Sequence, residues 1–97
     1  MDVQHKQQGD NGFFFVQRNG AIQARMTYSK PDAKTLSIEH TEVDDEIRHQ
    51  DVGYAMVQTA VDYARHHHYK IIPICPFVKS VFDKKPEYAD VRKDDIE

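Results

Sequence analysis

The chain has 97 residues and a formal net charge of −3, and 39% of its residues are apolar. This length suffices for one domain with one packed core, and the composition lies outside the range of disordered chains. Lysines and arginines are scattered along the sequence and form no basic stripe, which argues against a nucleic-acid partner. We therefore expect residues 1–97 to form a single domain that does not bind nucleic acid.

Membrane and disulfide-rich classes are also disfavoured. No apolar run approaches the roughly 20 residues that a membrane-spanning helix needs, and residues 1–5 lack the apolar core of a signal peptide. The single cysteine, Cys75, cannot form an internal disulfide or supply a zinc site made of several cysteines. These features predict a cytoplasmic protein with no membrane partner and no bound metal.

The first half of the chain has the patterns of antiparallel strands. A weak polar strand at residues 3–8 is followed by a phenylalanine-rich strand at residues 13–18. The Asn-Gly pair at residues 19–20 tolerates the positive φ of a type I′ turn and predicts a tight hairpin. Alternating strands then cover residues 22–28 and about 36–43. Alternation would turn one set of side chains inward, namely Ile22, Ala24, Met26, Tyr28, Leu36, Ile38 and His40.

The second half predicts a helix, a short strand and a second helix. The clearest helix places five apolar residues on one face: Met56, Val57, Ala60, Val61 and Ala64. The histidines at residues 66–68 suit the end of this helix better than a metal site, because three consecutive side chains point in different directions. A crossover helix predicts that the next strand, from residue 70 to about 75, is parallel to an earlier one. Residues 77–84 can form a short helix.

The predicted fold class is therefore α+β, with four antiparallel strands, a central helix, a fifth strand parallel to the fourth and a short C-terminal helix. The loop at residues 48–54 enters the central helix. Unpaired N–H groups and the positive end of the helix dipole favour phosphate at such a place. This order of elements resembles the GNAT superfamily of N-acetyltransferases.

Four motifs make the resemblance closer to a group of small GNAT-like proteins of about this length. His-Thr-x-Val falls at residues 40–43, Cys-Pro-Phe at 75–77, Asp-Tyr-Ala-Arg at 62–65 and Pro-Glu-Tyr at 86–88. The resemblance implies that acetyl-CoA or coenzyme A is bound as a substrate. It also implies acetyl transfer to an amine of a peptide, protein or small molecule. The alternative is a non-catalytic module of the same fold that holds CoA or an acyl-CoA.

The family's phosphate loop reads Arg-Gly-x-Gly-x-Gly or Ala. Its first position falls on Arg48, and His49 and Asp51 replace two of its glycines. A frame that starts at Gln50 breaks the spacing to the flanking motifs, so we prefer the Arg48 frame. Asp51 tolerates positive φ, but its carboxylate repels phosphate and predicts weakened CoA affinity unless it points outward. The resemblance implies these ligand-binding positions: Thr41, Glu42, Val43, Arg48, His49, Gln50, Asp51, Val52, Gly53, Tyr54 and Phe77.

The resemblance also places acyl transfer in the gap between the fourth and fifth strands, with a backbone N–H near Val43 polarising the thioester carbonyl. Cys75 would be either an acyl-accepting nucleophile or a small buried residue that lines the pocket. His40 would be either the base for Cys75 or a hydrogen-bonded core histidine. Tyr88 would be either a proton donor to the leaving thiolate or an aromatic anchor.

Overall fold

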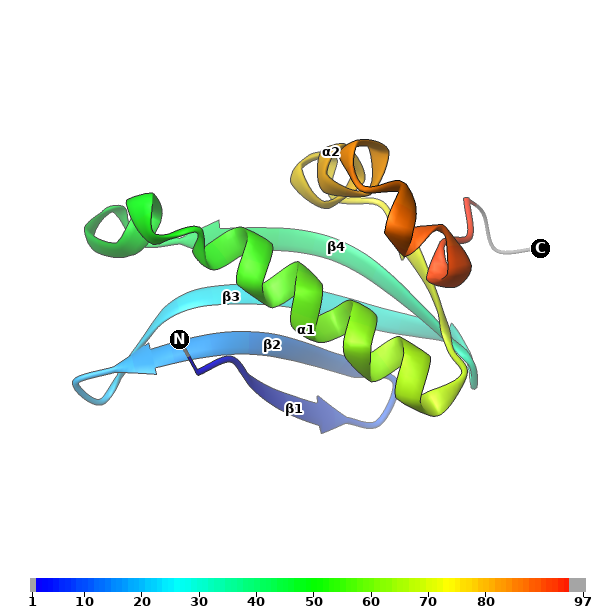
Figure 1. The fold of residues 1–97 in the computed structure, drawn as a ribbon. Coiled ribbons are helices and arrows are strands. Elements are labelled where there is room, and N and C mark those ends of the chain that lie inside the picture. Colours follow the sequence, from blue (N-terminus) through cyan, green and yellow to red (C-terminus); the bar gives the residue numbers. More distant parts are fainter. Residues whose placement is uncertain (1, 95–97) are drawn as a thin grey trace.

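The protein forms a five-stranded sheet with helices packed over one face (Figure 1). The computed structural model describes residues 2–94. Strands β1 to β4 are antiparallel neighbours, and β5 lies parallel to β4 at the edge of the sheet. The strands are β1 (Gln4–Gln8), β2 (Asn11–Arg18), β3 (Ala21–Asp32), β4 (Thr35–Val43) and β5 (Lys70–Pro73). The predicted α+β arrangement is confirmed.

Helix α1 (Val52–His67) lies across the sheet and follows a short 3-10 helix, η1 (Asp45–Gln50) (Figure 1). Helix α2 (Pro76–Lys84) and a second 3-10 helix, η2 (Pro86–Val91), follow β5 and pack beside α1. None of the helices within residues 2–94 has the length and apolarity that crossing a bilayer requires.

One face of α1 supplies the centre of the core. The apolar side chains of this face pack with inward-facing residues of the sheet such as Phe14, Met26 and Ile38. Burial of each of the larger ones contributes roughly 1.5–3 kcal/mol to the stability of the fold. The predicted inward residues of this helix are all fully buried: Met56, Val57, Ala60, Val61 and Ala64.

The hairpin between β2 and β3 has the predicted turn, because Asn19 and Gly20 have φ values of 53° and 80°. Beyond the turn the alternation is broken. Val16 pairs with Ala24 while the next residue of β2 pairs with Ile22, so β3 carries one surplus residue. Ile22 is consequently 39% exposed, and its predicted inward position is wrong.

A second bulge lies in β4. Tyr28 pairs with Ile38 and Thr27 pairs with His40, which leaves Glu39 as a surplus residue. The bulge shifts the alternation of side chains by one position. His40 is therefore exposed on the outer face of the sheet, where it pairs with Thr27. The predicted inward position of His40 is therefore wrong. The next residue, Thr41, pairs with the buried Met26 and faces inward instead.

An aromatic and histidine cluster fills the space between β1 and the C-terminal half of α1. The Nε2 atom of His5 lies 2.6 Å from the Tyr28 hydroxyl, and its ring stacks on Phe14 at a centroid distance of 4.3 Å. Burial lowers the pKa of His5, and the nearby His67 lowers it further. Burial raises the pKa of Tyr28 to about 12, with the neighbouring Tyr63 adding to the effect.

We expect the protein to lose stability as the pH falls below about 6.5, the ordinary pKa of histidine. The pKa of His5 is lower in the folded chain, so the unfolded chain takes up the proton first. The stabilising contribution of neutral His5 is complete above its pKa in the unfolded chain. This contribution declines as the pH falls toward its lower pKa in the folded chain. Melting temperatures measured between about pH 8 and pH 5 should fall less steeply for His5→Gln than for the wild type. Equal slopes would contradict this assignment.

Candidate functional site

The strands β4 and β5 separate at a defined point. The carbonyl of Ile38 accepts hydrogen bonds from the N–H groups of both Ile74 and Cys75, at 3.1 and 2.9 Å. Pairing between the two strands ends at Pro73, which faces Ile38. The bulge at Glu39 falls just beyond this point, where it bends β4 away from its neighbour. The remainder of β4 is therefore not paired with β5.

The unpaired edge of β4 carries hydrogen-bond donors. The N–H of Asp44 points toward β3, because it donates to the carbonyl of Gln23 at 2.8 Å. Alternate residues of an antiparallel strand turn their N–H groups to opposite sides. The N–H groups of Val43 and Thr41 therefore point into the gap, where a ligand can accept from them.

A cavity of about 250 Å³ lies between this edge and the first turn of α1. Every residue that lines it is among those predicted to bind the ligand. The lining consists of Thr41, Val43, Arg48, Asp51, Val52, Gly53, Tyr54 and Phe77.

The N-terminus of α1 has the geometry that a phosphate-binding turn needs. Asp51, the residue before the helix, has a φ of 56°, and its side chain forms no capping hydrogen bond. The first amides of the helix, from Val52 to Tyr54, are thus left without a side-chain cap. A Cβ atom on Gly53 would lie 2.6 Å from Cζ of Phe77. The Arg48 frame assigns glycine to both of these constrained positions, 51 and 53.

Two aromatic side chains form the apolar wall of the cavity. Phe77, in the first turn of α2, is half-buried and lies over Gly53. Tyr54 meets it edge-on, with ring centroids 5.6 Å apart. These rings offer apolar surface beside the polar edge of β4, a combination that suits a chain with alternating methylene and amide groups.

Arg48 joins the end of β4 to η1. Its guanidinium donates to the carbonyl of Val43 at 3.2 Å and pairs with Asp45 at 3.0 Å. Exposed ion pairs of this kind contribute little, so Arg48 can exchange Asp45 for a phosphate at small cost. A second arginine, Arg18, donates to the side chain of Gln50 at 2.8 Å and thereby holds the loop. Arg18 precedes the hairpin turn, and no signal in the sequence links it to this loop.

Five of the predicted residues, Cys75 among them, do not line the cavity. Glu42 pairs with Arg25 in the sheet, and His49 is exposed in η1. Gln50 lines a neighbouring groove, and His40 lies on the outer face.

Cys75 therefore has a different neighbour from the one expected. Its sulfur lies 3.4 Å from the hydroxyl oxygen of Thr41, and the residue is only 6% exposed. His40 pairs with Thr27 on the opposite face, so it cannot serve as the base for this thiol.

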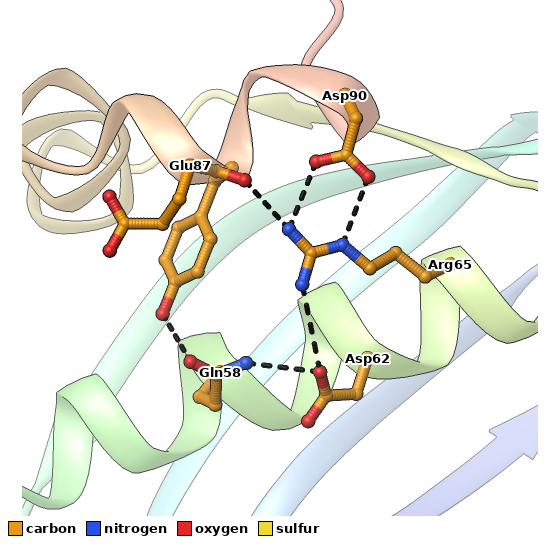
Figure 2. Close-up of polar contacts among 6 residues, drawn as sticks. Gln58, Asp62, Arg65, Glu87 and Asp90 are labelled. Atoms are coloured by element: carbon orange, nitrogen blue, oxygen red, sulfur yellow. Dashed lines mark hydrogen bonds and ion pairs between the residues drawn. The ribbon is translucent and has the colours of Figure 1, made fainter.

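The remaining motifs tie η2 to α1 (Figure 2). Arg65 forms two hydrogen bonds with the carboxylate of Asp90, at 2.9 and 3.0 Å, and one with the carbonyl of Glu87 at 2.7 Å. The hydrogen bond from Arg65 lowers the pKa of Asp90. Tyr88, 4% exposed, donates to the side chain of Gln58 at 2.6 Å. Tyr88 is thus an aromatic anchor.

One of the histidines at the end of α1, His68, terminates the helix. His68 takes a φ of 61°, and its N–H points back to the carbonyls of Ala64 and Arg65. This is the usual backbone arrangement that ends a helix. The cap therefore comes from the backbone of His68.

The assembled site offers two kinds of donor in one cavity. The open edge of β4 provides N–H groups for an amide-bearing chain, and the uncapped turn of α1 provides N–H groups and a positive dipole for phosphate. This combination suits a long anionic ligand that has a diphosphate joined to an extended amide-containing arm.

The sequence matches the family of GCN5-related N-acetyl-transferases over residues 13–91. No curated protein sequence matches the chain. The solution structure of a GCN5-like protein from Staphylococcus aureus, described as a candidate N-acetyltransferase, is 33% identical with a TM-score of 0.69. That alignment covers 97% of this chain and 90% of the other.

Larger acetyltransferases share the fold. The ribosomal-protein-S18-alanine N-acetyltransferase from Escherichia coli is 13% identical, with a TM-score of 0.64 and 80% of this chain covered. A GNAT family acetyltransferase from Elizabethkingia anophelis, with acetyl-CoA bound, is 16% identical, with a TM-score of 0.58 and 79% covered. Each alignment spans only 53% of the larger chain. From the family match and the similar Staphylococcus aureus protein, this chain belongs to the GCN5-related N-acetyltransferase family.

Proposed function

We propose that the protein binds acetyl-CoA between β4 and α1 and transfers its acetyl group to an amine. The observation that carries this proposal is the cavity that joins the unpaired N–H groups of β4 to the uncapped first turn of α1. The amides of residues 52–54 would receive the diphosphate, and Arg48 would add a positive charge. Thr41 and Val43 would hydrogen-bond the pantetheine arm.

With the thioester in this gap, the reaction would proceed by direct attack of the amine. The nitrogen of the acceptor amine would attack the thioester carbon while an N–H of the unpaired β4 edge stabilises the developing oxyanion. The new C–N bond forms as the C–S bond breaks. The amine loses one proton, and the departing sulfur leaves as a thiol after taking up one. We place the activity in the cytoplasm, without a nucleic-acid or membrane partner, as the sequence predicts.

We expect Cys75→Ala to retain acetyl transfer within about threefold of the wild type. The sulfur is buried against Thr41, and His40 lies on the opposite face of the sheet, so direct attack by the amine is favoured over an acyl-cysteine intermediate. Steady-state rates of CoA release at saturating acetyl-CoA provide the measurement. Loss of nearly all activity in Cys75→Ala, with acetyl-CoA binding unchanged, would establish Cys75 as a nucleophile.

A second function is favoured by the chemistry of the lining. Arg48 and Asp51 are the only charged residues that line the cavity among residues 2–94, and no histidine lines it. The one carboxylate of this lining, Asp51, would stand beside the diphosphate and not beside the thioester, so the site could hold CoA or an acyl-CoA without turnover. A non-catalytic binding module of the same fold is therefore the alternative.

Two measurements separate these functions. In residue-resolved NMR, acetyl-CoA should shift the amides of residues 50–54 and of Thr41 and Val43 under either proposal. Release of free thiol with a panel of peptide and small-molecule amines supports the transferase. Saturable binding without thiol release supports the module. If excess acetyl-CoA leaves all of these amides unshifted, both proposals are overturned.

A further inference from the structure

A cavity of about 710 Å³ lies on the outer face of the sheet, the face that the helices leave uncovered (Figure 1). Its floor includes Phe13 of β2 and Thr27 of β3, which pair with each other. Thr27 also pairs with His40, which places this floor on the outer side. The volume is in the usual range of about 300–1,000 Å³ for ligand sites. We call this space the outer cavity.

Two opposite charges stand at opposite ends of the outer cavity, because Lys6 lies on β1 and Glu39 on β4. Both residues are exposed, and neither forms a salt bridge within residues 2–94. Neighbouring strands are about 4.8 Å apart, so the backbones of these two residues are separated by roughly 14 Å. A ligand that matches both ends carries a positive and a negative group about this far apart.

Between the two charges the outer cavity offers apolar surface and free polar groups. Phe13 is half-buried, with the guanidinium of Arg25 4.8 Å from the centroid of its ring. The side chains of Gln8, Asn11 and Thr27 form no hydrogen bonds within the part of the chain that the structure describes. Amides and hydroxyls of this kind can bond the backbone of a peptide. An extended peptide advances about 3.3 Å per residue, so roughly four residues cover the distance between the charges.

Glu39 brings the outer cavity to the gap between β4 and β5. It follows Ile38, whose carbonyl marks the end of the pairing between these strands. The hydroxyl of Ser29 donates to the carboxylate of Glu39 at 3.1 Å and so holds it on this face. Ile74, which donates its N–H to the carbonyl of Ile38, is 56% exposed and offers an apolar contact at the same point. A ligand in the outer cavity therefore ends beside the gap.

We propose that the outer cavity binds the acceptor as an extended peptide with a free N-terminal amine and selects an acidic side chain near its fourth residue. The inference rests on the proposed function and names its substrate class. Glu39 would hold the N-terminal amine beside the gap, and Lys6 would pair with the acidic side chain. Phe13 would contact the residues between them. The floor ends at Glu39, so a chain that begins there needs no surface beyond the gap.

Thiol release from saturating acetyl-CoA with a set of pentapeptides tests this assignment. With glutamate at one of positions 3 to 5, the wild type should show a kcat/KM about three- to fivefold above that for alanine, the size expected for one exposed ion pair. Lysine at that position should give a lower value than alanine. Lys6→Glu should reverse the order, because the charge at that end of the cavity changes sign. Glu39→Gln should raise KM for every peptide about threefold and leave acetyl-CoA affinity unchanged.

Lys34→Glu and Glu87→Gln are the matched controls for these substitutions. Both residues are exposed and line neither the outer cavity nor the candidate site, and each substitution changes the net charge as its counterpart does. The order of the peptides and their KM values should stay as in the wild type. A reversed order in Lys34→Glu would indicate a general charge effect and overturn the assignment. An unchanged order in Lys6→Glu would overturn it as well.

A binding measurement separates this inference from the function on which it rests. In residue-resolved NMR with CoA present, the glutamate peptide should shift the amides of Lys6, Phe13 and Thr27. Such shifts without thiol release from any amine would overturn the proposed transfer, and with it the acceptor role, while the peptide site would stand. Thiol release without these shifts would overturn the peptide site and keep the transferase. Faster release with an N-terminally blocked lysine peptide or a small-molecule amine would also overturn the inference.

Discussion

Asp51→Asn should bind CoA about fivefold more tightly than the wild type, because one negative charge is removed beside the expected diphosphate. A like-charge contact at about 4 Å costs about 1 kcal/mol in water and more where water is excluded. Asp51 lines the cavity and is exposed, so the lower figure applies. Asparagine tolerates the φ of 56° at this position as aspartate does. Asp51→Gly should also bind CoA more tightly than the wild type does. Glycine removes the same charge and adopts the positive φ at this position freely.

The matched control for this substitution is Asp44→Asn. Asp44 is an exposed carboxylate that lines neither the cavity nor the adjoining groove, so its removal changes the net charge by the same amount. Calorimetry at two salt concentrations should give a CoA affinity that differs from the wild-type value for the Asp51 variant and equals it for the Asp44 variant. The difference should be smaller at the higher salt concentration, because salt screens the charge. Equal or weaker CoA binding by Asp51→Asn would show that the carboxylate does not face the phosphates.

Gly12→Ala should lower the melting temperature by roughly 5–15 °C. A Cβ atom on Gly12 would lie 2.5 Å from Cζ of Tyr28 and 2.7 Å from the backbone carbonyl oxygen of Lys6. The strand backbone cannot withdraw without disturbing its pairing, and overpacking of this kind costs about 1–3 kcal/mol. Each kcal/mol lowers the melting temperature of a small domain by roughly 4–8 °C.

Asn11→Ala provides the comparison for this strand. Asn11 is exposed and neighbours Gly12, and its replacement changes no buried packing, so its effect should stay within about 0.5 kcal/mol. Thermal unfolding followed by circular dichroism measures both variants. A Gly12→Ala protein that melts at or above the wild-type temperature would contradict the close packing of Tyr28 against β2.

Local patterns in the sequence were sufficient to predict most of the fold. The turn at Asn19 and Gly20 and the buried face of α1 were predicted because each depends on residues close together in the chain. The parallel pairing of the fifth strand joins distant residues, and it was predicted from the general rule for a strand that follows a crossover helix. The position of His40 was not predictable in this way. A bulge leaves no mark in the composition of a strand, so simple alternation was carried one residue too far beyond Ile38.

Within the candidate site, too, residues close together in the sequence were predicted and distant ones were not. The residues of the loop and of the end of β4 are close in sequence, and the family resemblance placed them together around one cavity. Arg18, which holds the loop through Gln50, comes from a distant segment. This tertiary contact has no local signal in the sequence.

The surplus residue Glu39 has a consequence for engineering the chain. If Glu39 were deleted, His40 and Thr41 could keep their present partners on β3 while β4 ran straight. The segment at Ile74 and Cys75 could then extend the parallel ladder past the carbonyl that now accepts two bonds. The edge of β4 beyond Ile38 would then be paired and would offer fewer free N–H groups to a ligand. A single surplus residue in β4 thus accompanies the opening between β4 and β5.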